Sequence, residues 1–186
     1  MKLLFSGLVL VLLLCRLPSQ GARSNDLQEP EAFKPKLGDL ELSLVAEKHS
    51  YRPDDRISLE IKLTNNNAVK DIFIYGTLQF GVRASLMLFR RDAKVQEVAP
   101  RFIDSAWDLP PKRDEVSAFV KLLPYHFLGK TYRSTIQMEH MEKPGRYSIW
   151  VEYNCPLSTA DVEVRPFWGK ENGSIKSNVI EIEVRR

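Results

Sequence analysis

The strongest constraint on the fold is an apolar side chain at every second position in several short segments. The cleanest example is ISLEIKL at residues 57–63, and similar alternation recurs at 40–45, 146–153 and 179–185. Successive side chains of a β-strand point to opposite faces, so this spacing separates apolar from polar side chains. These segments are therefore predicted to be strands with one face in a core and one in water.

Turn-forming residues separate these segments from further runs rich in β-branched and aromatic side chains. Further strands are expected at residues 71–75, 85–90, 95–98, 118–123 and 131–138. The run of three asparagines at 65–67 predicts a tight turn, because asparagine tolerates the left-handed backbone that such turns need. A second turn is expected to contain Pro124 and Gly129.

Two features complicate this strand pattern. Residues 114–123 also carry apolar side chains at helical spacing, so a short helix is the alternative there, although Pro124 favours a strand. The connections at 99–115 and 154–177 are long, and an edge strand at 162–164 would shorten the second. Seven or more short strands separated by turns predict an all-β, antiparallel β-sandwich with long inter-strand loops.

The N-terminus has the features of a secretory signal peptide. Lys2 precedes an apolar run at residues 3–15, which is shorter than the roughly 20 residues that cross a membrane. Small side chains at Ser19 and Gly21 favour cleavage before Ala22. We expect a signal peptide at 1–21, a flexible lead-in at 22–38 and one domain at 39–186. The product is expected to be secreted or periplasmic, with no membrane anchor after cleavage.

Charge and cysteine content narrow the function classes. The chain has 27 basic and 24 acidic residues, and loss of Lys2 and Arg16 with the signal leaves almost no excess. That balance gives no electrostatic basis for binding nucleic acid. Cys15 leaves with the signal, because Leu14 before it disfavours lipoprotein processing. Cys155 then remains alone and is expected to be a small, partly buried apolar side chain at a strand end; the alternative is a reactive or intermolecular thiol.

The sequence KPGRYSIWVEY at residues 143–153, followed by SNVIEIEV at 177–184, resembles secreted bacterial immunoglobulin-like domains. YRPDD at 51–55 and the strand after it resemble the first hairpin of the same class. The chain is also similar to proteinase-inhibitor-like sandwiches and to the non-catalytic sandwich that precedes some zinc metallopeptidase domains. The resemblance extends from Asp39 to the C-terminus and implies an immunoglobulin-like β-sandwich. Such sandwiches serve many functions, so it does not by itself define one.

Within this motif, three side chains have expected positions. Tyr147 should pack its ring inward while its hydroxyl bonds a nearby backbone group, as in a tyrosine corner. Ile149 stands where the immunoglobulin pattern places its second cysteine, so no disulfide joins the sheets. Trp150 should face the other side of its sheet.

Motifs for catalysis and metal binding are missing from the sequence. It contains no glycine-rich phosphate loop, no HExxH, no GxSxG and no CxxC, so we expect a non-enzyme without catalytic residues or cofactors. Met138, His140 and Met141 would suit reduced copper chemically. In extended chain, however, Met141 points away from the other two, so Met138 is expected in the core, His140 in solvent and no metal site.

Aromatic side chains in loops are the best candidates for a binding site. The candidates are Trp107, Tyr125, His126, Phe167 and Trp168, with Phe127 in the same turn as Tyr125. Exposed aromatics on the loops of a rigid scaffold mark binding sites. The alternative is that these side chains fold back and cover sheet edges.

We therefore expect an exported, non-catalytic β-sandwich that acts as a protein-binding or structural module and whose partner is another exported protein. One alternative is a secreted peptidase inhibitor or peptidase-associated domain, with a rigid loop at Pro110–Pro111 or at 124–126. The other is a periplasmic copper-binding protein.

Overall fold

The computed structural model describes residues 33–76, 78, 86–92, 99–101 and 116–186. The chain divides into two units, residues 1–31 and 32–186, and every described residue belongs to the second. The expected strand at 95–98 lies outside the described residues.

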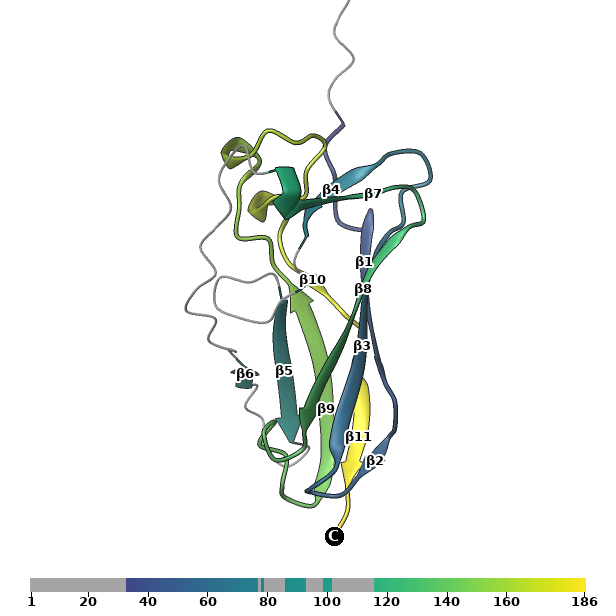
Figure 1. The fold of residues 1–186 in the computed structure, drawn as a ribbon, viewed down its shortest axis with the longest axis vertical. Helices are drawn as coiled ribbons and strands as arrows, with labels where there is room; N and C mark the ends of the chain where they lie inside the picture. The colour runs from purple at the N-terminus through teal and green to yellow at the C-terminus, as the bar shows by residue number, and fades with distance from the viewer. Residues whose placement is uncertain (1–32, 77, 79–85, 93–98, 102–115) are drawn as a thin grey trace, which may run out of the picture. The chain divides into compact units, whose positions relative to one another are not determined.

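The described chain consists of β-strands and three short 3-10 helices (Figure 1). The strands are β1 (Leu40–Ala46), β2 (Ser50–Tyr51), β3 (Arg56–Asn65), β4 (Ile72–Tyr75), β5 (Leu86–Asp92), β6 (Ala99–Arg101), β7 (Phe119–Leu122), β8 (Phe127–Thr135), β9 (Gly145–Tyr153), β10 (Ile175–Lys176) and β11 (Ile180–Val184). The helices are η1 (Val116–Ala118), η2 (Thr159–Asp161) and η3 (Lys170–Asn172). The all-β prediction is confirmed.

These strands form three sheets. One sheet has the order β1-β3-β8, a second has the order β2-β11-β9-β5-β6 with β10 beside β9, and β4 pairs with β7 in a third. The pairings are antiparallel, except that the two-residue β2 runs parallel to β11. Figure 1 shows β3 and β8 on one side, with β9 and β5 on the other.

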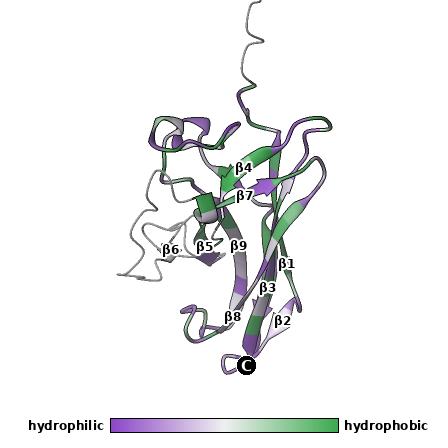
Figure 2. Ribbon diagram, turned by 45° about the horizontal axis from the view of Figure 1, so that its top comes forward, coloured by the Kyte–Doolittle hydropathy of each residue, from purple (hydrophilic) through white to green (hydrophobic). Residues whose placement is uncertain are grey.

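The core follows from the period-two pattern. Ile57, Leu59, Ile61 and Leu63 of β3 are all fully buried, and the residues between them are exposed or half-buried. They belong to one apolar cluster that also includes the inner faces of β1, β9 and β11. Figure 2 shows apolar and polar residues alternating along β3, whereas β4 is coloured as hydrophobic. The two larger sheets therefore enclose a common core.

The tyrosine corner is confirmed. The Tyr147 ring is buried, and its hydroxyl donates a hydrogen bond to the Lys143 carbonyl at 2.8 Å. Trp150 faces the opposite side of β9, as expected. There its ring stacks on Phe89 with centroids 5.5 Å apart, and the Lys176 ammonium lies 4.3 Å from the Trp150 centroid. At Trp150 the outer face of β9 is thus covered by side chains of the neighbouring strands β5 and β10.

Both outer edges of the three-stranded sheet carry features that oppose strand addition. On β1, the Asn178 side chain accepts from the Leu44 amide at 2.8 Å and donates to the Leu44 carbonyl at 2.9 Å. On β8, Lys130 pairs with the fully buried Ile61 and is therefore directed toward the inner face of the sheet. An inward-directed charge on an edge strand disfavours pairing with another chain.

Several boundaries differ from those expected. The strand predicted at 131–138 is β8, which begins at Phe127 and includes Gly129, because pairing with β3 continues to that end. The segment predicted as a strand at 118–123 starts as η1 and becomes β7 only at Phe119. Residues 162–164 form no strand.

The end of the expected flexible lead-in packs on the domain. Pro35 is buried, and its carbonyl accepts a hydrogen bond from the Asn172 amide. The Lys36 amide donates to the Asp39 carboxylate at 2.8 Å. Phe33 also packs against the core cluster. Residues 33–38 of the expected lead-in thus contact the domain.

Cys155 is buried at the end of β9, as expected. Its thiol is 4% exposed and donates to the Leu157 carbonyl at 3.5 Å, and burial raises its pKa to about 12. At about pH 8 the reactive thiolate is therefore a minute fraction of the native protein. We predict that a disulfide reagent labels the native protein at least about 100-fold more slowly than the urea-unfolded chain. Similar labelling rates for both forms would contradict the buried position.

Candidate binding surface

The turn between β7 and β8 holds a tyrosine in an uncommon backbone conformation. Tyr125 has φ +61°, in the left-handed region that non-glycine residues seldom adopt. Its amide donates to the Asn65 carbonyl at 2.8 Å, and the His126 amide donates to the Leu123 carbonyl at 3.0 Å. Such a conformation persists only where surrounding contacts hold it. Residues 123–127, called here the aromatic turn, therefore have a fixed backbone.

Asn65 at the end of β3 is the anchor of this turn. Its side chain is 0% exposed, and its amide nitrogen donates to the carbonyls of Lys70 and Leu122, both at 2.9 Å. Its backbone amide donates to the His126 carbonyl at 2.9 Å. Sequence analysis assigned Asn65 only to a turn. Its position in the alternating pattern could have identified it as buried, because Asn65 occupies the next inward position after Leu63.

The three asparagines form their turn by side-chain hydrogen bonds. None of them has a positive φ, so the expected left-handed backbone is wrong. Instead, the Asn65 side-chain oxygen accepts from the Asn67 amide at 2.9 Å. The Asn67 oxygen in turn accepts from the amides of Val69 and Lys70. These bonds satisfy backbone groups of the loop at residues 65–71.

The aromatic turn presents its side chains to solvent. Tyr125 is 67% exposed and Phe127 57% exposed, and His126 is exposed between them. The Lys62 ammonium lies 5.5 Å from the centroid of the Phe127 ring. Val69, on the loop that Asn65 joins to the turn, is also exposed. Figure 1 shows this loop and the aromatic turn at the same end of the strands.

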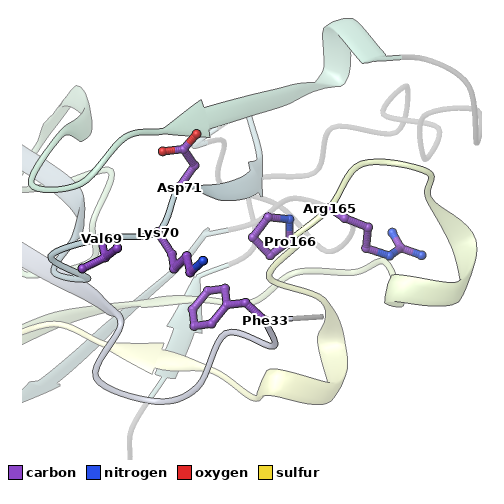
Figure 3. A pocket seen from close by; sticks show the side chains of 6 residues that line it. All are labelled: Phe33, Val69, Lys70, Asp71, Arg165 and Pro166. Atoms are coloured by element: carbon purple, nitrogen blue, oxygen red, sulfur yellow. The ribbon is translucent and has the colours of Figure 1, made fainter. Parts of the chain in front are cut away.

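A hollow lies beside the same loop (Figure 3). It comprises two adjoining spaces of about 350 and 300 Å³ that share Phe33, Arg165 and Pro166. We call it the Phe33 hollow. The first space is completed by Val69, Lys70 and Asp71, and the second by Lys34, Pro35, Thr159, Phe167, Glu171 and Asn172.

Most polar groups around the Phe33 hollow have partners. The Arg165 guanidinium donates to the carbonyls of Thr159, Val162 and Val164 at 2.6–2.9 Å. Asp71 forms an ion pair with Lys121 at 3.4 Å.

Glu171 accepts from the Thr159 amide at 2.8 Å. Its partial burial acts to raise the pKa of the carboxyl, but hydrogen bonds from Thr159 and its own amide outweigh this and lower it. The carboxylate is thus the favoured form.

Phe167 and Trp168 are not surface residues. They are 1% and 0% exposed, because Phe167 forms a parallel bridge with Phe73 and the Trp168 amide donates to the Phe73 carbonyl. The expectation that they form an exposed aromatic surface is therefore wrong, and they cover β4 as the alternative describes. Tyr125 and His126 are brought together at the surface. Trp107 and Pro110–Pro111 lie outside the described residues.

The three groups considered for copper do not gather at one place. Met138 is exposed, opposite to the expectation, whereas Met141 is buried in the core. His140 is exposed as expected and has φ +54°, which places the chain in a turn. Among the described residues no cluster of three histidine, cysteine or acidic side chains could hold a metal ion. No helix in the same part of the chain is long and apolar enough to span a membrane.

Comparisons with known proteins do not assign a family. No family model matches the chain, and no curated protein sequence matches it. Among solved structures, the sporulation control protein Spo0M from Bacillus subtilis is 13% identical over 81% of this chain and 51% of its own, with a TM-score of 0.41. A β-glucosidase from Erythrobacter marinus is 12% identical over 78% of this chain and 15% of its own, with a TM-score of 0.38.

A β-glucosidase from Listeria innocua is 13% identical over 79% of this chain and 16% of its own, with a TM-score of 0.35. The chain thus spans between 15% and 51% of the length of these three structures. Likenesses at this level bear on neither family nor activity.

Asn65 offers a direct test of how the turn is held. Asn65→Ala leaves the buried Leu122 carbonyl, the partly buried Lys70 carbonyl and the Asn67 amide without their partner, so we predict a loss of about 2–4 kcal/mol in the free energy of unfolding. Urea denaturation measures this change. Asn66→Ala is the matched control, because Asn66 is exposed and its side chain bonds only Glu41; it should cost less than about 0.5 kcal/mol. Equal stability of the two variants would show that Asn65 does not anchor the turn.

Proposed function

We propose that this protein is an exported, non-catalytic module with an immunoglobulin-like β-sandwich that binds another exported protein through the aromatic turn. The observation that carries the proposal is Tyr125, whose exposed ring stands on a backbone in the left-handed region. Tyrosine gains nothing for the fold from that position. Strained, fixed residues of this kind concentrate at functional sites.

The residue types of the turn suit a protein interface. Tyrosine and phenylalanine supply large contact areas, and aromatic residues are enriched where proteins bind each other. Tyr125 and Phe127 lie on either side of the exposed His126. Hydrogen bonds from the buried Asn65 fix the backbone beneath them, so little order would be lost on binding.

Other features support the wider assignment. Two sheets with a common core and a tyrosine corner at Tyr147 are features of immunoglobulin-like sandwiches. The apolar run at residues 3–15 and the small side chains before Ala22 support export. On the three-stranded sheet, the blocked edges of β1 and β8 disfavour strand addition, which favours binding through its loops.

The test is capture of a partner by the exported protein, followed by identification and a binding measurement with the purified partner. Tyr125→Gly combined with Phe127→Ala removes both rings, and glycine suits the backbone at position 125. We predict at least about tenfold weaker binding, as for the loss of an aromatic anchor. Circular dichroism and thermal unfolding should remain those of the native protein.

Val179→Ala is the control, because Val179 is an exposed apolar side chain away from the turn, immediately before β11. It should leave the affinity unchanged. A partner that binds the double variant as tightly as the native protein would place the interface elsewhere.

A secreted peptidase inhibitor is the second candidate, because a rigid, exposed turn is also what enters a peptidase cleft. Pro124, Tyr125 and His126 would form the inserted segment. Such an inhibitor should slow at least one secreted peptidase at equimolar concentration, and Tyr125→Gly should relieve the inhibition. No effect on a panel of secreted serine, cysteine and metallopeptidases would count against it.

A further inference from the structure

We infer that the Phe33 hollow receives an acidic segment of the binding partner, with one apolar or aromatic side chain seated between Phe33 and Pro166 and neighbouring carboxylates facing Lys34 and Lys70. This inference rests on the proposed function, because it specifies the chemistry of the partner. It adds a second contact beside the aromatic turn.

The floor of the hollow is apolar and held in place from both sides. Phe33 packs against the core cluster. The Pro166 carbonyl accepts from the Phe73 amide at 2.8 Å, which fixes this proline against β4. Pro35 is buried and its carbonyl is bonded by Asn172. The seat between the two rings therefore exists before a ligand arrives.

The charges at the rim are unbalanced. Neither Lys34 nor Lys70 lies within 4.0 Å of a carboxylate of the described residues. Among the described residues, the Arg165 guanidinium bonds only to backbone carbonyls, which leave its positive charge uncompensated. Asp71 is paired with Lys121, whereas the Glu171 carboxylate is bonded by the neutral Thr159 amide and retains its charge, so the positive charges of Lys34, Lys70 and Arg165 still outnumber it. The hollow therefore favours an anionic partner.

Figure 3 shows the Lys70 ammonium directed toward the space between Phe33 and Pro166. A carboxylate beside a seated apolar side chain would meet this ammonium. The Lys70 carbonyl is also bonded by Asn65, which anchors the aromatic turn. One extended partner segment can thus contact both features.

Lipid phosphates are also anionic, but the geometry favours a peptide. A space of about 350 Å³ with an apolar floor and a charged rim admits one side chain.

The experiment measures fluorescence anisotropy with short labelled peptides and the exported protein. The first peptide has one phenylalanine flanked by aspartates and glutamates, the second has lysines in place of the acids, and the third has alanine in place of phenylalanine. We expect the first to bind at least about tenfold more tightly than either of the others. Raising the salt concentration from about 50 to about 300 mM should weaken that binding.

Lys70→Glu should weaken binding of the acidic peptide about tenfold. In Phe33→Ala, the acidic peptide with phenylalanine should bind no more tightly than the peptide with alanine in its place. Lys48→Glu is the matched control, because Lys48 is an exposed lysine beyond the opposite end of β1 and the change in net charge is identical. It should leave binding within about twofold of the native value.

Equal binding of acidic and basic peptides, or an unchanged affinity in Lys70→Glu, would overturn the inference. A lipid partner would also overturn it. The protein would then bind vesicles of the anionic lipid phosphatidylglycerol but not vesicles of phosphatidylcholine, and it would not bind the acidic peptide. If the captured partner depends on Tyr125 and Phe127 but not on Lys70, the proposed function stands and this inference falls.

Discussion

The hydrogen bonds of one buried amide hold the exposed end of this fold together. Asn65 continues the inner face of β3 and joins its own loop at 65–71 to a segment distant in sequence, the end of β7 and the turn before β8. A buried amide without partners would destabilise the fold, so these segments must meet in this one arrangement. This arrangement determines both the position of the aromatic turn and the position of Lys70 at the hollow.

The rest of the described surface offers fewer places for a partner. Asn178 occupies the backbone groups of β1 at Leu44, and Lys130 directs its charge inward along the edge of β8. On the outer face of β9, Phe89 and Lys176 cover the Trp150 ring. Strand addition to the three-stranded sheet and stacking on that tryptophan are therefore disfavoured on physical grounds, which favours the loop end of this sheet.

The sequence predicted the features that local periodicity determines. The predictions failed where contacts between residues distant in sequence determine the structure. Alternation alone located the buried face of β3, and the likeness of the motif around Tyr147 to a tyrosine corner predicted its hydroxyl bond. Gly129 suggested a turn, but nine residues of pairing with β3 keep it in β8. Phe167 and Trp168 were expected at the surface because nothing in the sequence indicates their bridge to Phe73. The Phe33 hollow depends on contacts such as that between Pro35 and Asn172, which have no sequence periodicity.

The aromatic turn and the Phe33 hollow differ in the kind of contact they can make, and this difference constrains the partner. Tyr125 and Phe127 project from a fixed backbone, so they suit a partner with a shallow apolar depression. The hollow is concave and carries uncompensated positive charge, so it suits a projecting side chain with acidic neighbours. A partner that uses both needs a depression and a projecting acidic segment side by side. Few surfaces combine these features, so the pair of contacts gives more specificity than either one alone.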